Sequence, residues 1–273
     1  MKKKLSVFNT LTLAIVYIFM YAPLLVMVFF SFNSDNSTFK FAGFSLRWYK
    51  ELFSRSDILE AFRNTLVLAV CSSVIATVIG TIAAYGIYRV RNKFFQSAMM
   101  SVTNIPMMNP DIVTGVSLML LFVFVGRLMG AQNSLSFFTL LCAHITFNIP
   151  YVILNVLPKL RQTDIRLYEA AMDLGCTPGK AFFKVVLPSI TPGIISGLLM
   201  AFTLSLDDFV ISYYTGYGFQ TLPIIIESMT RKRVKPDMYA LSSIIFVTIL
   251  LLLVVTNIIQ MRGEKKDVKK QKG

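Results

Sequence analysis

The sequence contains few of the residues that build metal sites, disulfide frameworks and most catalytic centres. Its 273 residues include one histidine, His144, and three cysteines, Cys71, Cys142 and Cys176. The cysteines have no CxxC spacing, and one histidine cannot complete the usual set of four zinc ligands. Neither a structural zinc site nor a disulfide framework is therefore expected.

Acidic residues are also scarce. There are 14 Asp and Glu against 27 Lys and Arg, which gives a net charge of +13. In a soluble chain this excess would suggest nucleic acid as a partner. Here many basic residues stand in short blocks beside hydrophobic stretches, as at residues 2–4 and 262–272. Such blocks set the orientation of a chain in a membrane, so no nucleic-acid partner is expected.

Hydrophobic residues, in contrast, dominate the composition. They make up 55% of the chain, charged residues only 15%, and the mean hydropathy is +0.64. Soluble domains contain roughly 45–50% apolar residues with glycine included, and a soluble protein of this size could not bury so much apolar surface. The composition predicts an all-α, polytopic protein of the cell membrane and excludes disorder and collagen-like repeats.

Six stretches are apolar enough to cross a bilayer, which takes about 20 residues. The first is expected to be a retained helix, since it shows neither the short core nor the cleavage site of a signal peptide. The third is short, and Pro106 and Pro110 before it predict a broken or kinked entry. Gly80 and Gly86 in the second predict close helix packing. The predicted spans cover residues 11–32, 65–88, 112–126, 134–157, 193–215 and 239–261.

Six crossings place both termini on one side, and the charge distribution selects that side. The terminal side carries 17 Lys and Arg and the other side 10, so both termini are expected in the cytoplasm, although the basic cluster 231–235 runs against the rule. We divide the chain into residues 1–60 (first span and external loop), 61–261 (a transmembrane domain with the five further spans and the polar segment 158–192) and a basic tail, 262–273.

The polar segment 158–192, between the fourth and fifth spans, predicts two short helices. Residues 164–174 carry apolar side chains on one face at helical spacing, and Gly175 follows where a helix would stop. Thr177 and Pro178 have the pattern of an N-cap and first-turn residue. A second helix is expected from there to about Leu187, with Pro188 marking its end. The segment would form a compact cytoplasmic projection.

A spaced motif in this segment resembles the EAA loop of ABC importer permeases with a MetI-like fold. It consists of Glu169-Ala170-Ala171, Gly175 and Leu187-Pro188, with Val185 where the family prefers isoleucine. In that family the loop docks on a separate cytoplasmic ATPase, which binds ATP and Mg, and transmits its closure to the membrane helices. The resemblance thus assigns ATPase coupling to Glu169, Ala170, Ala171, Asp173, Gly175, Leu187 and Pro188.

Two other interpretations of this segment are weaker. An amphipathic segment lying on the membrane would explain its helicity but not the spacing of the motif. A phosphate-binding loop is rejected, because residues 175–181 are one residue short of GxxxxGK[ST], lack the hydroxyl for magnesium and follow no strand. The chain itself is expected to be a transport subunit and not an enzyme.

Asp207 and Asp208 lie in the fifth predicted span, about 21 Å beyond Gly193 at 1.5 Å per residue. An ionised carboxylate in the membrane is costly, so at least one should face a cavity or a cationic partner. Either they help form a pathway for a cationic solute, or one lies near the headgroups and the other bonds a neighbouring helix through Asn148. Adjacent helical residues point about 100° apart, so a catalytic aspartyl dyad is not expected.

Several stretches resemble the PotC-type permease of spermidine/putrescine importers: residues 187–197, 201–212 with both aspartates, 104–117, and Arg63-Asn64-Thr65. The resemblance implies a PotB-type partner permease, two copies of a PotA-type ATPase and an external PotD-type polyamine-binding protein. Polyamines are polycations whose methylenes pack on aromatic rings. Asp207, Asp208, Asp111, Tyr213 and Tyr214 are therefore the candidates for the substrate pathway.

Alternatives remain open at these positions. A second interpretation of Asp111 is that it caps the helix after Pro110. The tyrosines would also suit membrane-interface anchors, and His144 is expected to be a packed, hydrogen-bonded residue. Related permeases carry ferric iron or other solutes. An ion-coupled secondary transporter predicts internal repeats, which are not evident, and a membrane enzyme lacks a nucleophile–base or metal constellation.

Overall fold

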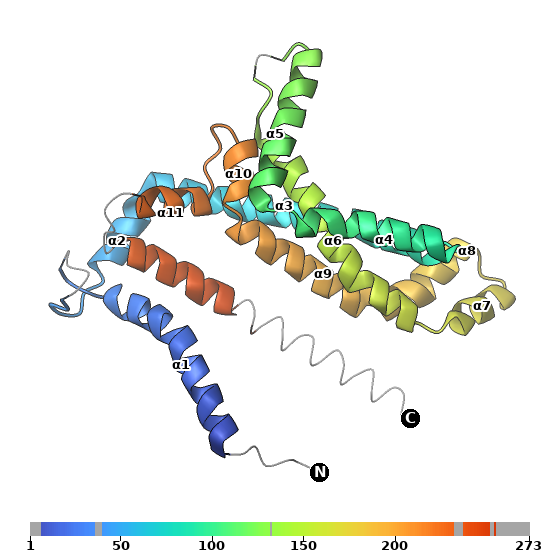
Figure 1. The fold of residues 1–273 in the computed structure, drawn as a ribbon, viewed down its shortest axis with the longest axis horizontal. Helices are drawn as coiled ribbons and strands as arrows, with labels where there is room; N and C mark the ends of the chain where they lie inside the picture. Colours follow the sequence, from blue (N-terminus) through green and yellow to red (C-terminus); the bar gives the residue numbers. More distant parts are fainter. Residues whose placement is uncertain (1–6, 36–39, 132, 232–236, 252–253, 255–273) are drawn as a thin grey trace. The chain divides into compact units, whose positions relative to one another are not determined.

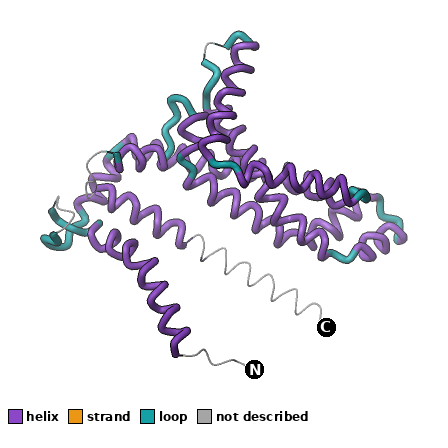
Figure 2. The backbone as a smooth tube through the Cα atoms, viewed as in Figure 1, coloured by secondary structure: helices purple, strands orange, loops and turns teal. Residues whose placement is uncertain are grey.

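The computed structural model describes residues 7–35, 40–131, 133–231, 237–251 and 254, and these are mostly helical (Figures 1 and 2). Within the described residues, β pairing is limited to one bridge between Asn33 and Phe44. The predicted all-α fold is confirmed. The helices are α1 (Val7–Phe30), α2 (Arg47–Ser54), α3 (Ser56–Arg89), α4 (Lys93–Met108), α5 (Asp111–Leu128), α6 (Phe137–Gln162), α7 (Ile165–Asp173), α8 (Pro178–Ala181), the π-helical turn η1 (Phe182–Val186), α9 (Leu187–Asp207), α10 (Val210–Thr215), α11 (Leu222–Thr230) and an unlabelled helix Asp237–Leu251.

Five of the described helical segments are long and apolar enough to cross a membrane. They correspond to the first five predicted spans. The sixth, 239–261, begins in the helix Asp237–Leu251, and nearly all of its remainder lies outside the described residues. So do residues 2–4, most of the cluster 231–235 and the tail 262–273, and the count of six spans stays a prediction. The five segments are Asn9–Phe30, Ser56–Arg89, Asp111–Leu128, Phe137–Gln162 and Pro178–Asp207.

Internal packing divides the chain into two compact units. The first contains the described residues of 1–59 and 226–253, and the second those of 60–225 with residue 254. In the first unit, the Trp48 indole N–H donates to the Asn33 carbonyl at 2.6 Å, and the Asn33 amide nitrogen donates to the Lys40 carbonyl at 2.8 Å. These bonds tie Asn33 to Lys40 and to α2. The division at residues 60 and 261 stays a prediction.

The core of the second unit forms where α6 and α9 pack along each other, with α3 beside them (Figure 1). Val152 and Val156 of α6 and Ile190 and Ala201 of α9 have no exposed surface. In water, the burial of such side chains is the main contribution that favours packing. Between helices in a membrane, close van der Waals contact takes that role. The buried members of this cluster are Ala84, Ile87, Val152, Ile153, Val156, Leu157, Leu160, Val186, Ile190 and Ala201.

Glycines permit the closest approaches in this unit. A Cβ added to Gly80 of α3 would lie 2.7 Å from the Val152 Cβ, and one added to Gly193 of α9 would lie 2.8 Å from the Asn155 carbonyl oxygen. Gly86 has no such neighbour within 4 Å. The expectation of close packing is therefore right for Gly80 and wrong for Gly86, which is exposed.

Three predicted helix boundaries are wrong. Pro188 does not end a helix, because α8, η1 and α9 follow one another without interruption from Pro178 to Asp207. At η1 the Leu187 N–H bonds to the Phe182 carbonyl, five residues back. This wider turn shifts the hydrogen-bond register just before a proline that has no N–H to donate. The fifth span thus begins well before Gly193, and it is interrupted at Asp208 instead of continuing to Thr215.

The glycine contacts predict unequal effects of two otherwise identical substitutions. Gly193→Ala should lower the free energy of unfolding by about 1–3 kcal/mol, because the new methyl group meets backbone that cannot rotate away. Gly86→Ala adds the same methyl group in open space and should be neutral or slightly stabilising, since alanine favours helix. Titration of the purified protein from mild detergent into SDS measures both. Equal effects of the two substitutions would contradict the α6–α9 packing.

Candidate functional site

We call the segment 158–192 the EAA loop. Its first arm is the helix α7, which is capped at both ends. The Asp164 carboxylate accepts the Arg166 N–H at 3.0 Å at its start. At its end, the Gly175 N–H bonds to the Met172 carbonyl at 2.9 Å and the Cys176 N–H to the Ala171 carbonyl at 3.0 Å. This is a Schellman motif, and its terminating residue adopts a left-handed conformation that glycine accepts without strain; φ of Gly175 is +84°.

The second arm, α8 and η1, is held against the end of α3. Thr177 and Pro178 start α8 as predicted, and Ala181 is buried. The Phe182 ring contacts the Tyr85 ring edge to face, with centroids 4.7 Å apart. The EAA loop is thus joined to α6 and α9 through the chain and to α3 through this aromatic contact.

The tip of the EAA loop presents apolar side chains to its surroundings. Leu174 is 87% exposed, Phe183 66% and Leu167 55%. Glu169 and Asp173 are exposed beside them. Leu187 is half-buried and packs against the α6–α9 core, whereas Pro188 is exposed. The residues of the motif therefore fall into two groups, one on α7 and at its end and one in η1 and at the start of α9.

A groove separates the EAA loop from the end of α3. Its volume is about 520 Å³, and the side chains lining it include Glu169 and Val185 of the motif. The Arg89 guanidinium lines it as well, donating to the Tyr85 hydroxyl at 3.1 Å and lying 5.8 Å from the centroid of that ring. Both halves of the spaced motif thus border one groove, which the sequence alone did not predict. Further lining residues are Tyr88 and Tyr168.

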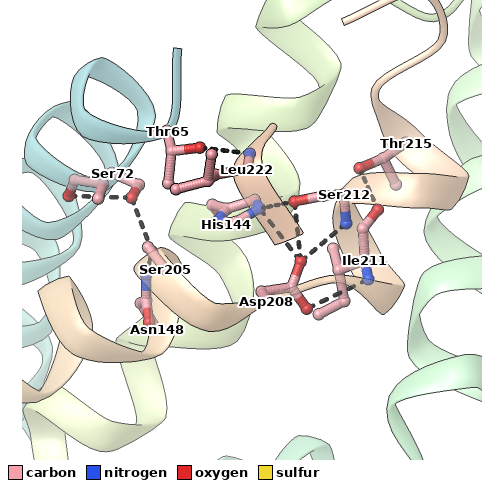
Figure 3. Close-up of polar contacts among 11 residues, drawn as sticks. Thr65, Ser72, His144, Asn148, Ser205, Asp208, Ile211, Ser212, Thr215 and Leu222 are labelled. Carbon is pink, nitrogen blue, oxygen red and sulfur yellow. Dashed lines mark hydrogen bonds and ion pairs between the residues drawn. The ribbon is translucent and has the colours of Figure 1, made fainter. Parts of the chain in front are cut away.

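A second group of polar residues surrounds the break between α9 and α10 (Figure 3). Helix α9 ends at Asp207, Asp208 has an extended backbone, and α10 starts at Val210. The Asp208 carboxylate accepts the Ser212 N–H at 2.8 Å, the Ser212 hydroxyl at 2.9 Å and the Ile211 N–H at 3.2 Å. Its side chain is 10% exposed. Asp208 therefore caps α10.

Helix α6 contributes two buried polar side chains to this region. His144 Nε2 lies 3.0 Å from the Ser212 hydroxyl oxygen and 3.4 Å from the Asp208 carboxylate. One turn along α6, the Asn148 amide donates to the Ser205 hydroxyl at 2.8 Å, and Ser205 shares a hydrogen bond of 2.9 Å with Ser72 of α3. Asp208 thus bonds a neighbouring helix through His144, and the expectation of Asn148 as its partner is wrong.

Asp207 and Asp111 have different surroundings from Asp208. Both are exposed, and they lie close enough for their charges to act on each other. Helix α5 packs on α10 at Gly115, where an added Cβ would lie 3.1 Å from the Tyr214 ring. Asp111 is the first residue of α5, and no side-chain hydrogen bond caps this helix. The structure brings three predicted carboxylates to one region, but within the described residues no metal-ligand cluster is present.

The two tyrosines predicted to line the substrate pathway differ in exposure. Tyr213 is 60% exposed and its ring stands 5.5 Å from that of Phe209, whereas Tyr214 is half-buried against α5. His144 is buried and hydrogen-bonded as expected, but its contact with Asp208 was not predicted. The sequence offers only a weak signal for this polar group. Ser212 stands four residues after Asp208, a spacing that allows these two side chains to contact each other across one helical turn.

Comparisons with known proteins identify the family of the chain. The pattern of a family described as "Binding-protein-dependent transport system inner membrane component" matches residues 76–266. The putrescine transport system permease protein PotI of Escherichia coli is 39% identical over 254 residues, 93% of this chain and 90% of that protein. The spermidine/putrescine transport system permease protein PotC of the same species is 36% identical over 260 residues, 93% of this chain and 95% of that protein.

Solved structures show the same fold at lower identity. A bacterial ABC transporter involved in import of the acidic polysaccharide alginate matches with a TM-score of 0.71 and 17% identity, over 93% of this chain and 94% of that chain. The MetNI methionine ABC transporter in an inward facing conformation matches with a TM-score of 0.61 and 17% identity, over 76% and 95% of the two chains. The MetI-like fold expected from the EAA motif is therefore confirmed.

Proposed function

Since the chain belongs to the family of binding-protein-dependent transport system inner membrane components, we propose that it carries a polyamine through the cell membrane as the permease subunit of an ABC importer. The permease role follows from the family and from relatives that are themselves permease subunits. The names of PotI and PotC, together with the exposed carboxylates, support spermidine or putrescine as the solute.

The observation that best supports coupling to a separate ATPase is the exposed tip of the EAA loop. Leu174, at 87% exposure, and Leu167 form an apolar surface beside the carboxylates of Glu169 and Asp173. A contiguous apolar surface rimmed by charges is typical of a protein interface. A partner ATPase would bind here and supply ATP and Mg, and its movement would reach α6 and α9, which both adjoin the loop. The remaining proposed partners are a PotB-type permease and a PotD-type external binding protein.

Orientation follows from the same assignment. Loop docking on a cytoplasmic ATPase requires residues 158–192 to face the cytoplasm. The continuous helical segment Pro178–Asp207 has 30 residues and is about 45 Å long at 1.5 Å per residue. Asp207 and Asp208 then lie towards the external side, where a cationic solute would enter from the binding protein. Both termini would be cytoplasmic.

The cargo assignment rests on negative charge beside aromatic rings. Asp207 and Asp111 are exposed near each other, and Tyr213 presents its ring on the adjoining α10. Separated ammonium groups of a polyamine would pair with the carboxylates, and its methylenes and charges would pack on the ring. A hard trivalent cation such as ferric iron would instead require several oxygen ligands converging on one point.

The left-handed conformation of Gly175 predicts a specific loss of coupling. Gly175→Ala should weaken ATPase binding several-fold, because a Cβ in that conformation costs about 1–2 kcal/mol and shifts the end of α7. Gly179→Ala is the matched control, since Gly179 lies in α8 with nothing within 4 Å of an added Cβ. Co-purification of the ATPase with each variant and uptake into proteoliposomes measure the effect. Normal ATPase binding and uptake by Gly175→Ala would contradict the assignment.

The exposed carboxylates predict a change in apparent substrate affinity. Asp207→Asn and Asp111→Asn should each raise the KM of spermidine or putrescine uptake about fivefold, the equivalent of about 1 kcal/mol for a partly exposed charge pair. Glu60→Gln removes an exposed carboxylate from the start of α3 and should leave KM unchanged. Uptake of labelled polyamine by vesicles holding the complete importer is the measurement, with ferric iron as competitor. A wild-type complex that transports iron and no polyamine would refute the cargo.

A further inference from the structure

Adjacent aspartates at the end of α9 have opposite environments. The Asp207 side chain is exposed, whereas Asp208 is 10% exposed and has three hydrogen-bond donors and His144 within 3.4 Å of its oxygens. A carboxylate oxygen has two lone pairs, so these groups leave Asp208 little capacity for a solute. The two residues therefore have different tasks.

Asp208 replaces backbone acceptors that the break removes. In an uninterrupted helix, the N–H groups of Ile211 and Ser212 would bond to the carbonyls of residues 207 and 208. Here the Asp208 carboxylate accepts both. Inside a membrane, unpaired backbone groups are costly, and irregular backbone persists only where protein or enclosed water satisfies it. The carboxylate thus stabilises the break itself.

Helix α6 bridges this break from the side. His144 contacts Ser212 and Asp208 at the start of α10, and Asn148, four residues later on the same face of α6, bonds Ser205 at the end of α9. Figure 3 shows the two side chains of α6 directed to either side of the break. His144 Nδ1 is buried and has no hydrogen-bond partner among the described residues, so a proton there would be poorly stabilised. A proton on Nε2 would point at the Ser212 hydroxyl, with the Asp208 carboxylate 3.4 Å away.

We propose that His144 is a positioning residue for transport: by donating to Asp208 and Ser212 it holds Asp208 on α10 and leaves Asp207 as the carboxylate of the pair that faces the solute. The proposal rests on the proposed function. Because α6 and α9 both adjoin the EAA loop, His144 also keeps α10 aligned with α6 when the loop is displaced. His144 acts through Asp208 and does not touch the solute.

The test compares His144→Leu with His144→Gln in the complete importer reconstituted in vesicles. Leucine removes the donor and should lower the maximal rate of uptake about tenfold, because that is the scale of one lost hydrogen bond to a charged group. The KM should stay within about twofold of the wild-type value. Glutamine places an amide N–H near the position of His Nε2 and should restore most of that rate. Thr146→Val is the matched control, because Thr146 is exposed on α6 and its hydroxyl bonds only to the Cys142 carbonyl of its own helix.

A second measurement does not depend on the cargo. Tyr217, 74% exposed just after α10, is replaced by cysteine in a chain whose three native cysteines are serine, and its labelling by a thiol reagent is timed. The labelling rate should change about threefold or more in His144→Leu, which is the scale of one lost hydrogen bond. In His144→Gln it should return to the value without a substitution at His144. Unchanged labelling or unchanged uptake in His144→Leu would overturn the proposal, as would a rise in KM equal to that of Asp207→Asn.

The two proposals fail in different ways. A wild-type complex that takes up no polyamine refutes the cargo, while the labelling rates still decide the role of His144. Wild-type polyamine uptake combined with labelling that His144→Leu leaves unchanged refutes the role of His144 alone.

Discussion

Close contact between α6 and α9 is the interaction on which the remaining structure depends. Gly193 allows the α9 backbone to approach the Asn155 carbonyl, and Val152 and Ile190 are fully buried in the core that these two helices share with α3. Between helices in a membrane, small residues at the crossing and dense packing replace the hydrophobic driving force that water provides elsewhere. Because the EAA loop connects the same two helices, a displacement of the loop acts on both of them together.

The opposite end of this helix pair holds the proposed substrate pathway. There α9 stops, and buried polar side chains supply the partners that the interrupted backbone has lost, since the bilayer offers none. Asp208 is engaged in this task, while Asp207 and Asp111 remain exposed. An importer of polycations needs a negative pathway that stays in place while its helices move. In the proposed pathway, a fixed break with an exposed carboxylate beside it would meet both requirements.

Much of this architecture could be predicted from the sequence, because long apolar runs and the spaced EAA motif are local signals. The α7 helix, its stop at Gly175 and the start at Thr177 followed from residue types with strong backbone preferences. The passage of the helix through Pro188 could not be predicted, since it depends on a widened turn at η1 that no single residue specifies. The contact of Asp208 with His144 joins residues 64 positions apart in sequence, and only tertiary packing decides whether His144 or Asn148 contacts Asp208.

The most direct test of the account is whether the EAA loop and α9 move as one body. Spin labels at Leu174→Cys, on the exposed tip, and at Met200→Cys, on an exposed face of α9, report their separation by pulsed electron resonance in the reconstituted importer. The account predicts that this distance stays constant within about 2 Å between nucleotide-free and ATP-bound states, well below one helical turn of about 5.4 Å. A change of a full turn or more during active uptake would contradict it, because the loop would then move without carrying α9.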